Sequence, residues 1–205
     1  MIRALKSFIY VLVLLALFAC STDNAGQKDG VLTPVKQNER NSQIINSLGF
    51  DPLLMYELEV KSNDIKIIHV WVEHYKDGEK QDDLIKGSTA TSETMTLAYS
   101  KLDFNLDENT TYAQWTISVA DGTTLSTFES TPTELKDNLG MGQTWVDDKT
   151  IIEAEKPITL SLSVRNSRNG VGIGLGDDVI ENAIKDSEEV FVVKAMISKQ
   201  EEFFD

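Results

Sequence analysis

The chain has 205 residues, enough for one ordinary domain and a tether, and its 33 acidic against 19 basic residues give a net charge of −14. Loss of an N-terminal segment that holds Arg3, Lys6 and no acid would leave 17 basic residues and a net charge of −16. A surface this negative repels phosphate backbones and anionic headgroups, which makes nucleic acid a poor candidate partner and excludes a basic membrane-binding face.

The N-terminus has the pattern of an export signal. After Arg3 and Lys6, residues 8–19 form an apolar run of about 12 residues, too short to cross a hydrocarbon core of about 30 Å as a helix. The run ends at Leu17-Phe18-Ala19-Cys20 and is followed at once by polar residues. This ending resembles the lipobox of bacterial lipoproteins, with an aliphatic residue at −3, a small residue at −1 and then cysteine, although Phe18 at −2 is larger than usual.

The resemblance covers residues 1–21 and implies a processing route. Residues 1–19 would be a signal peptide removed by a peptidase, and the Cys20 thiol would carry a diacylglyceryl group. Two or more acyl chains hold a protein durably to a membrane, whereas one does so only marginally. The resemblance therefore implies a protein anchored by membrane lipid through Cys20 at the extracytoplasmic face of the cell membrane.

Residues 20–50 are predicted to form the lipidated cysteine and a flexible tether. Residues 21–43 are polar, contain Gly26, Gly30 and Pro34, and show no sustained apolar period. A short helical turn is compatible with residues 42–48, because Ile44, Ile45 and Leu48 have helical spacing.

Residues 51–205 are predicted to fold as an all-β domain. Apolar residues recur at every second position in residues 54–60, 112–119, 158–164 and 191–197, as half-buried strands require. Asp-Gly pairs at 77–78 and 121–122 indicate hairpin turns. About eight strands predict an antiparallel β-sandwich. An immunoglobulin-like topology is one option, although the cysteine pair of antibody domains is absent.

One short helix is expected before the last strand. Val179, Ile180, Ala183 and Ile184 form a small apolar stripe at helical spacing. Asp178, three residues before Glu181, approximates a capping box.

A ligand groove is a candidate in the glycine-rich residues 170–176. If these residues form a strand, one face carries Val171, Ile173 and Leu175, and the other is bare backbone at Gly170, Gly172, Gly174 and Gly176. Glycines on a sheet face allow close packing or leave a shallow groove, which Trp71, Trp115 or Trp145 could cover. The spacing does not match a dinucleotide-binding fingerprint.

No metal site or cofactor is predicted. His69 and His74 are five residues apart on one expected strand, so they face opposite sides of the sheet. The acidic pairs at 147–148 and 177–178 do not match the spaced loop of a calcium-binding EF-hand.

The sequence favours a non-catalytic module that binds an envelope protein or a cell-wall component. It has no nucleophile-elbow motif, and Cys20 is its only cysteine. The alternative is a lipoprotein that binds or senses a small ligand or cation near residues 170–176. A hydrolase using two carboxylates is the third hypothesis, because the spacing of such a pair depends on the fold.

Overall fold

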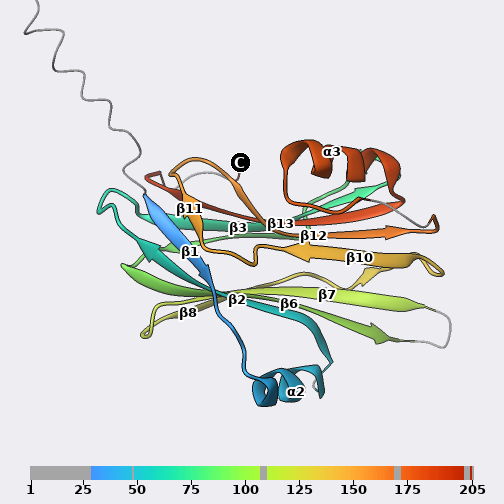
Figure 1. The fold of residues 1–205 in the computed structure, drawn as a ribbon, viewed down its shortest axis with the longest axis horizontal. Helices are drawn as coiled ribbons and strands as arrows, with labels where there is room; N and C mark the ends of the chain where they lie inside the picture. The colour runs from blue at the N-terminus through green and yellow to red at the C-terminus, as the bar shows by residue number, and fades with distance from the viewer. Residues whose placement is uncertain (1–28, 48, 107–109, 169–171, 201–203, 205) are drawn as a thin grey trace, which may run out of the picture.

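The computed structural model describes residues 29–47, 49–106, 110–168, 172–200 and 204. The predicted signal peptide, Cys20 and the first part of the tether lie outside these residues. Within them the chain forms two antiparallel β-sheets packed face to face, with two short helices (Figure 1). The prediction of an all-β sandwich is confirmed.

The first sheet, sheet A, has seven strands. In spatial order its strands are β11 (Thr150–Ile152), β1 (Gly30–Pro34), β2 (Phe50–Val60), β6 (Thr94–Asn105), β7 (Thr111–Ala120) and β8 (Leu125–Glu129), with β9 (Thr133–Glu134) also paired to β7.

The second sheet, sheet B, has six strands and carries one helix on its outer face (Figure 1). Its strands in order are β10 (Gly140–Trp145), β12 (Ile158–Asn166), β13 (Glu189–Ser198), β3 (Ile67–Lys76) and β4 (Glu79–Lys80), with β5 (Ile85–Ala90) also paired to β3. Helix α3 (Asp177–Asp186) covers sheet B, while helix α2 (Glu39–Ser47) lies beside β2.

Alternating burial explains why the period-two runs become strands. In β7, Ala113, Trp115, Ile117 and Val119 are at most 2% exposed, whereas the residues between them are half-buried. Strand β13 is buried on both faces, because sheet A covers one face and α3 packs on the other. The apolar residues at every second position thus form the inward face of each strand. Whether the opposite face is also buried depends on what packs against it.

Both predicted Asp-Gly turns are confirmed. Asp77 and Gly78 have φ angles of 49° and 83° and form the two-residue connection between β3 and β4. Gly122 has a φ of 84° in the longer turn that joins β7 to β8. There the Asp121 carboxylate accepts hydrogen bonds from the backbone N–H groups of Thr123 and Thr124.

The domain begins earlier than the predicted boundary at residue 51. Residues 30–34 form β1, a strand between β2 and β11, and not a tether. Val31 and Leu32 are 3% and 1% exposed. Five residues ending in proline give little periodic signal, and their burial depends on partners far along the chain.

The predicted helix before the last strand is confirmed as α3, but its predicted cap is wrong. The N-cap residue is Gly176, which makes no side-chain capping bond. Asp177 and Asp178 lie in the first turn, where their charge is favourable near the positive end of the helix dipole. The expected turn near residues 42–48 is a helix over residues 39–47, α2.

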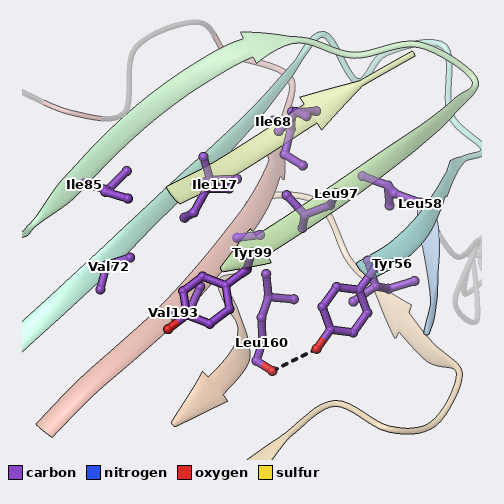
Figure 2. Packing of buried hydrophobic residues seen from close by; sticks show 14 of the residues in the cluster. Tyr56, Leu58, Ile68, Val72, Ile85, Leu97, Tyr99, Ile117, Leu160 and Val193 are labelled. Carbon is purple, nitrogen blue, oxygen red and sulfur yellow. Dashed lines mark hydrogen bonds between the residues drawn. The ribbon is translucent and has the colours of Figure 1, made fainter. Parts of the chain in front are cut away.

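Large buried side chains join the two sheets. The Trp115 ring of sheet A lies 4.6 Å from the Phe191 ring of sheet B, centroid to centroid, and Trp115 is fully buried. The Tyr56 hydroxyl donates a hydrogen bond of 3.3 Å to the Leu160 carbonyl across the core (Figure 2). The core contacts of these long side chains fix how the sheets stack.

A glycine in β5 lets an aromatic ring of the other sheet come close. A Cβ atom at Gly87 would lie 2.4 Å from Cδ1 of Phe128, a residue of β8. No real side chain tolerates such a contact, so one of the two must move. The pair therefore sets the spacing of the sheets at this edge.

We expect Gly87→Ala to lower the free energy of unfolding by about 1–3 kcal/mol, the usual cost of overpacking. Adding Phe128→Leu should recover part of the loss, because the smaller side chain leaves room. Denaturant unfolding measures both, with Gly172→Ala as the control, since no atom lies within 4 Å of that Cβ position. Equal stability of Gly87→Ala and the wild type would contradict the packing argument.

Candidate functional site

A groove of about 580 Å³ lies at the seam between the two sheets. Residues 34–37 and 52–56 of the β1–β2 region form one wall, and residues 145–147 at the end of β10 form the other. Its volume falls within the usual range for ligand sites of about 300–1,000 Å³. The groove combines apolar side chains with the charged groups of Lys36 and Asp147.

Trp145 is the prominent aromatic side chain of this groove. It ends β10 and is 42% exposed, and Val35 in the opposite wall is 39% exposed. Exposed tryptophan is unusual for a purely structural role and is enriched at binding hot spots. Of the residues predicted from sequence to line a ligand site, Trp145 is the one in this groove.

The strand predicted over residues 170–176 is wrong for its described part. Residues 172–176 form a loop that leads into α3, and Gly170 lies outside the described residues. Gly174 and Gly176 pack against Val179 of the helix, while a Cβ at Gly172 would meet open space. None of these described glycines lines the Trp145 groove, so the structure does not bring the predicted set together.

The two histidines lie on opposite faces of β3, as their spacing predicts. The His69 ring contacts Phe204 and Ser88 on the outer side of sheet B, whereas the His74 ring stacks on Phe191 in the interior. Over the described part of the chain, no three His, Cys, Asp or Glu side chains converge in a way that could hold a metal ion.

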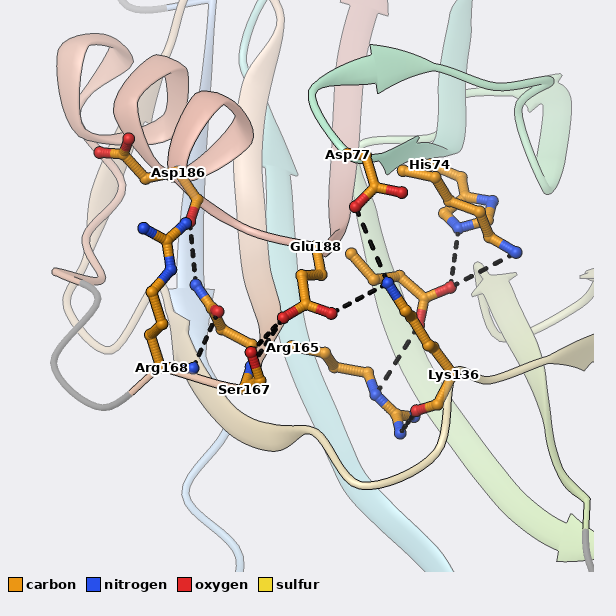
Figure 3. Close-up of polar contacts among 11 residues, drawn as sticks. His74, Asp77, Lys136, Arg165, Ser167, Arg168, Asp186 and Glu188 are labelled. Carbon is orange, nitrogen blue, oxygen red and sulfur yellow. Dashed lines mark hydrogen bonds and ion pairs between the residues drawn. The ribbon is translucent and has the colours of Figure 1, made fainter.

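A second candidate is a charged cluster around Glu189 at the start of β13 (Figure 3). The Glu189 side chain is 1% exposed, and its Oε1 atom lies 3.2 Å from His74 Nε2 and 3.7 Å from Lys76 Nζ. Its Oε2 atom lies 3.7 Å from Arg165 Nε, too far for a hydrogen bond. Glu189 is thus a buried carboxylate held by a hydrogen bond with His74 and by the charges of Lys76 and Arg165.

The rim of this cluster is a network of exposed and half-buried charges. Lys136 Nζ lies 2.9 Å from Glu188 and 3.8 Å from Asp77, and these residues enclose a pocket of about 290 Å³ (Figure 3). Hydrogen bonds from Ser167 and Lys136 lower the pKa of Glu188 to about 2. Because the positive groups are already paired with carboxylates, we interpret the cluster as an ion network that closes this end of the sandwich.

A third charged group, Glu73, lies on the outer face of β3 and is fully engaged. It accepts hydrogen bonds from Trp71 Nε1, Tyr75 Oη and Lys194 Nζ at 3.0–3.2 Å. Burial alone would raise the pKa of Glu73, but these donors outweigh it and hold the pKa below its ordinary value. A carboxylate this well satisfied stabilises the sheet and has little capacity left for a ligand.

A hollow of about 1,040 Å³, larger than the Trp145 groove, lies at the opposite end from Glu189, between the loops around residues 61–66 and 91–93. None of its lining residues holds a buried polar side-chain atom without a hydrogen-bond partner within the described chain. This hollow is distinguished by its volume alone, whereas the Trp145 groove combines an exposed aromatic side chain with charged groups at its margin.

Sequence reasoning missed the Glu189 cluster and the second wall of the Trp145 groove. His74 and Glu189 are 115 positions apart and meet because β3 pairs with β13. The local sequence signal for this cluster is Glu189 itself, which stands at the start of the strongly apolar residues 190–193. A glutamate in this position places a charge at the edge of the core.

The fold and groove define a class of protein: a two-sheet antiparallel β-sandwich with an open seam and no metal cluster among the residues described. The family model described as the YgaN domain matches residues 31–197, and the chain belongs to this family. Comparisons with curated proteins and with solved structures found no match. The matched range includes β1, in agreement with the earlier start of the domain.

We expect Glu189→Gln to lower the free energy of unfolding by about 3 kcal/mol, because it removes the charge that faces the Arg165 guanidinium, whose side chain is 12% exposed. The matched control is Glu181→Gln on α3, whose side chain is 71% exposed and should contribute little. Denaturant unfolding at neutral pH separates the two. Equal effects would show that the Glu189 network does not stabilise the fold.

Proposed function

We propose that this chain is a lipoprotein anchored through Cys20 at the extracytoplasmic face of the cell membrane, where its sandwich binds another envelope protein or a cell-wall component without catalysis. The observation that carries the binding part is the Trp145 groove at the seam of the sheets. The anchoring part rests on the lipobox-like Leu17-Phe18-Ala19-Cys20 sequence. Among the described residues, no helix is long and apolar enough to span a membrane.

The groove suits recognition of a partner surface. Trp145 and Val35 offer apolar contact area from opposite walls, and Lys36 and Asp147 supply charge at the margin. An aromatic anchor surrounded by polar groups is the usual composition of a protein-binding hot spot. The groove is open along the side of the sandwich, so an extended ligand can enter without any rearrangement of the core.

The tether geometry is compatible with this role. Eight residues lie between Cys20 and Asp29, and the nine steps from one to the other give a reach of at most about 30 Å. Asp29 is fixed to the sandwich, because its carbonyl accepts a hydrogen bond from Lys61 N and its carboxylate accepts one from Ala154 N. Lipidation at Cys20 would therefore hold the Asp29 end of the domain close to the bilayer.

The alternative, a small-ligand or cation sensor near residues 170–176, has less support. Ile173 packs beside Gly142 of β10, and Gly174 packs against Val179. Trp145, one of the side chains that could cover the glycines, lines a different surface. These contacts favour a packing role for the described glycines.

The proposed anchoring depends on the Cys20 thiol. Cys20→Ser should prevent incorporation of labelled palmitate and shift the protein from the membrane fraction to the soluble or unprocessed fraction. Ser21→Ala is the matched control, because it changes the next residue and keeps the thiol. Equal palmitate labelling of both variants would contradict lipidation at Cys20.

The proposed binding of a partner depends on Trp145 in the groove. In-cell crosslinking and affinity recovery with anchored wild-type protein should capture a partner that Trp145→Ala fails to capture. Leu125→Ala is the control, because Leu125 is 67% exposed on β8, an edge strand of sheet A. Capture by Trp145→Ala at the wild-type level would place the interaction elsewhere.

A further inference from the structure

Strand β10 has a free backbone edge. It is the terminal strand of sheet B and pairs only with β12 in the described chain (Figure 1). Val146 N donates to Leu160 O, and the register of the ladder is constant from residue 140 to 146. In an antiparallel ladder every second residue is hydrogen-bonded to the partner strand. Because Val146 bonds to β12, the residues at even positions do so too, and the N–H and C=O groups of Met141, Gln143 and Trp145 point away from β12.

This edge differs from the other sheet margins of the described chain. Proteins protect edge strands by making them short or by giving them charged residues, proline or bulges. Strands β11, β9 and β4 have three, two and two residues, and β8 and β5 carry Glu129 and Lys86. Strand β10, with the sequence GMGQTW, has six residues, no charge, no proline and a regular register.

The open edge lies beside the Trp145 groove. Met141 Sδ contacts Lys101 Nζ of sheet A, so the side chains of Met141, Gln143 and Trp145 lie on the face of β10 that is turned toward sheet A. A strand added beyond β10 would also alternate its side chains. One set would point toward sheet A and reach the groove near Trp145.

We propose that β10 binds an extended, positively charged segment of another polypeptide by antiparallel strand addition, with alternate side chains in the Trp145 groove. The proposal rests on the proposed binding function and names its mode and partner. The alternating free N–H and C=O groups match the donors and acceptors of another polypeptide backbone, a pattern that a glycan lacks. The net charge of −14, with Asp147 and Asp148 after β10, favours a basic segment over a second copy of this acidic chain.

The test uses the full lipidated protein in detergent micelles and linear ten-residue peptides selected on it from a random display library. Selected peptides should be rich in Lys and Arg and should line up with β-branched residues at alternate positions. The decisive comparison is Gln143→Pro with Gln143→Ala. Both lose the side-chain amide, but only proline also removes the N–H at the free edge, a position where edge strands tolerate it.

We expect Gln143→Pro to bind the selected peptides at least tenfold more weakly than Gln143→Ala by fluorescence anisotropy. If Gln143→Pro does not fold, the same peptides carrying N-methyl groups at alternate positions are tested on the wild type, and the methylated peptides should lose affinity. Equal affinities in either comparison, or no selected peptide, would overturn strand addition.

The two proposals fail in different ways. Peptides that lose affinity with Trp145→Ala but bind both Gln143 variants equally would keep the groove and overturn strand addition. Peptides unaffected by all three substitutions would overturn both proposals. A wild-type dimer that dissociates in Gln143→Pro, measured by light scattering, would assign the edge to a second copy and overturn the basic-peptide partner.

Discussion

The burial of β3 and β13 on both faces is the constraint on which the other features depend. Sheet A covers their inner face, and α3 and Phe204 cover their outer face, so polar residues on these strands have little access to water. A buried carboxylate must be paired, because an isolated charge in the interior costs several kcal/mol. Glu73 and Glu189 are accordingly surrounded by donors and positive groups. The clusters around Glu73 and Glu189 therefore stabilise the fold, and the candidate binding features lie at the margins of the sheets.

At those margins the two sheets differ. The outermost strands of sheet A are the three-residue β11 and the five-residue β8, which ends at Glu129. Sheet B ends on one side in β10, whose six uncharged residues lie next to a groove. A free edge is a standing risk of aggregation unless something covers it or a partner uses it. This edge and the exposed Trp145 side chain are the two observations on which the proposed recognition of a partner rests.

The local pattern of apolar residues predicted which segments form strands, but not which strands pair with one another. The period-two runs matched β2, β7, β12 and β13, because one face of each lies against the core. Residues 172–176 have an ambiguous pattern, since alternating glycine and apolar residues suit a strand as well as a loop that packs on a helix. Strand β1 was missed because its five residues are buried only through β2 and β11. Trp145 lines a groove other than the one expected at residues 170–176, and the opposite wall comes from residues about 90 to 110 positions earlier, which no local signal could reveal.

Under the proposed anchoring, the position of the groove determines how a partner approaches. Strand β1 starts beside Asp29 at the tethered end and runs about 13 Å to Pro34, where the groove begins. The groove and the β10 edge would then lie along the side of a domain held close to the bilayer, with the Glu189 cluster at its far end. A short tether limits rotation and reach, which raises the effective concentration of partners in the same layer of the envelope. Lateral access therefore favours a basic segment of a neighbouring envelope protein over a ligand arriving from the bulk medium.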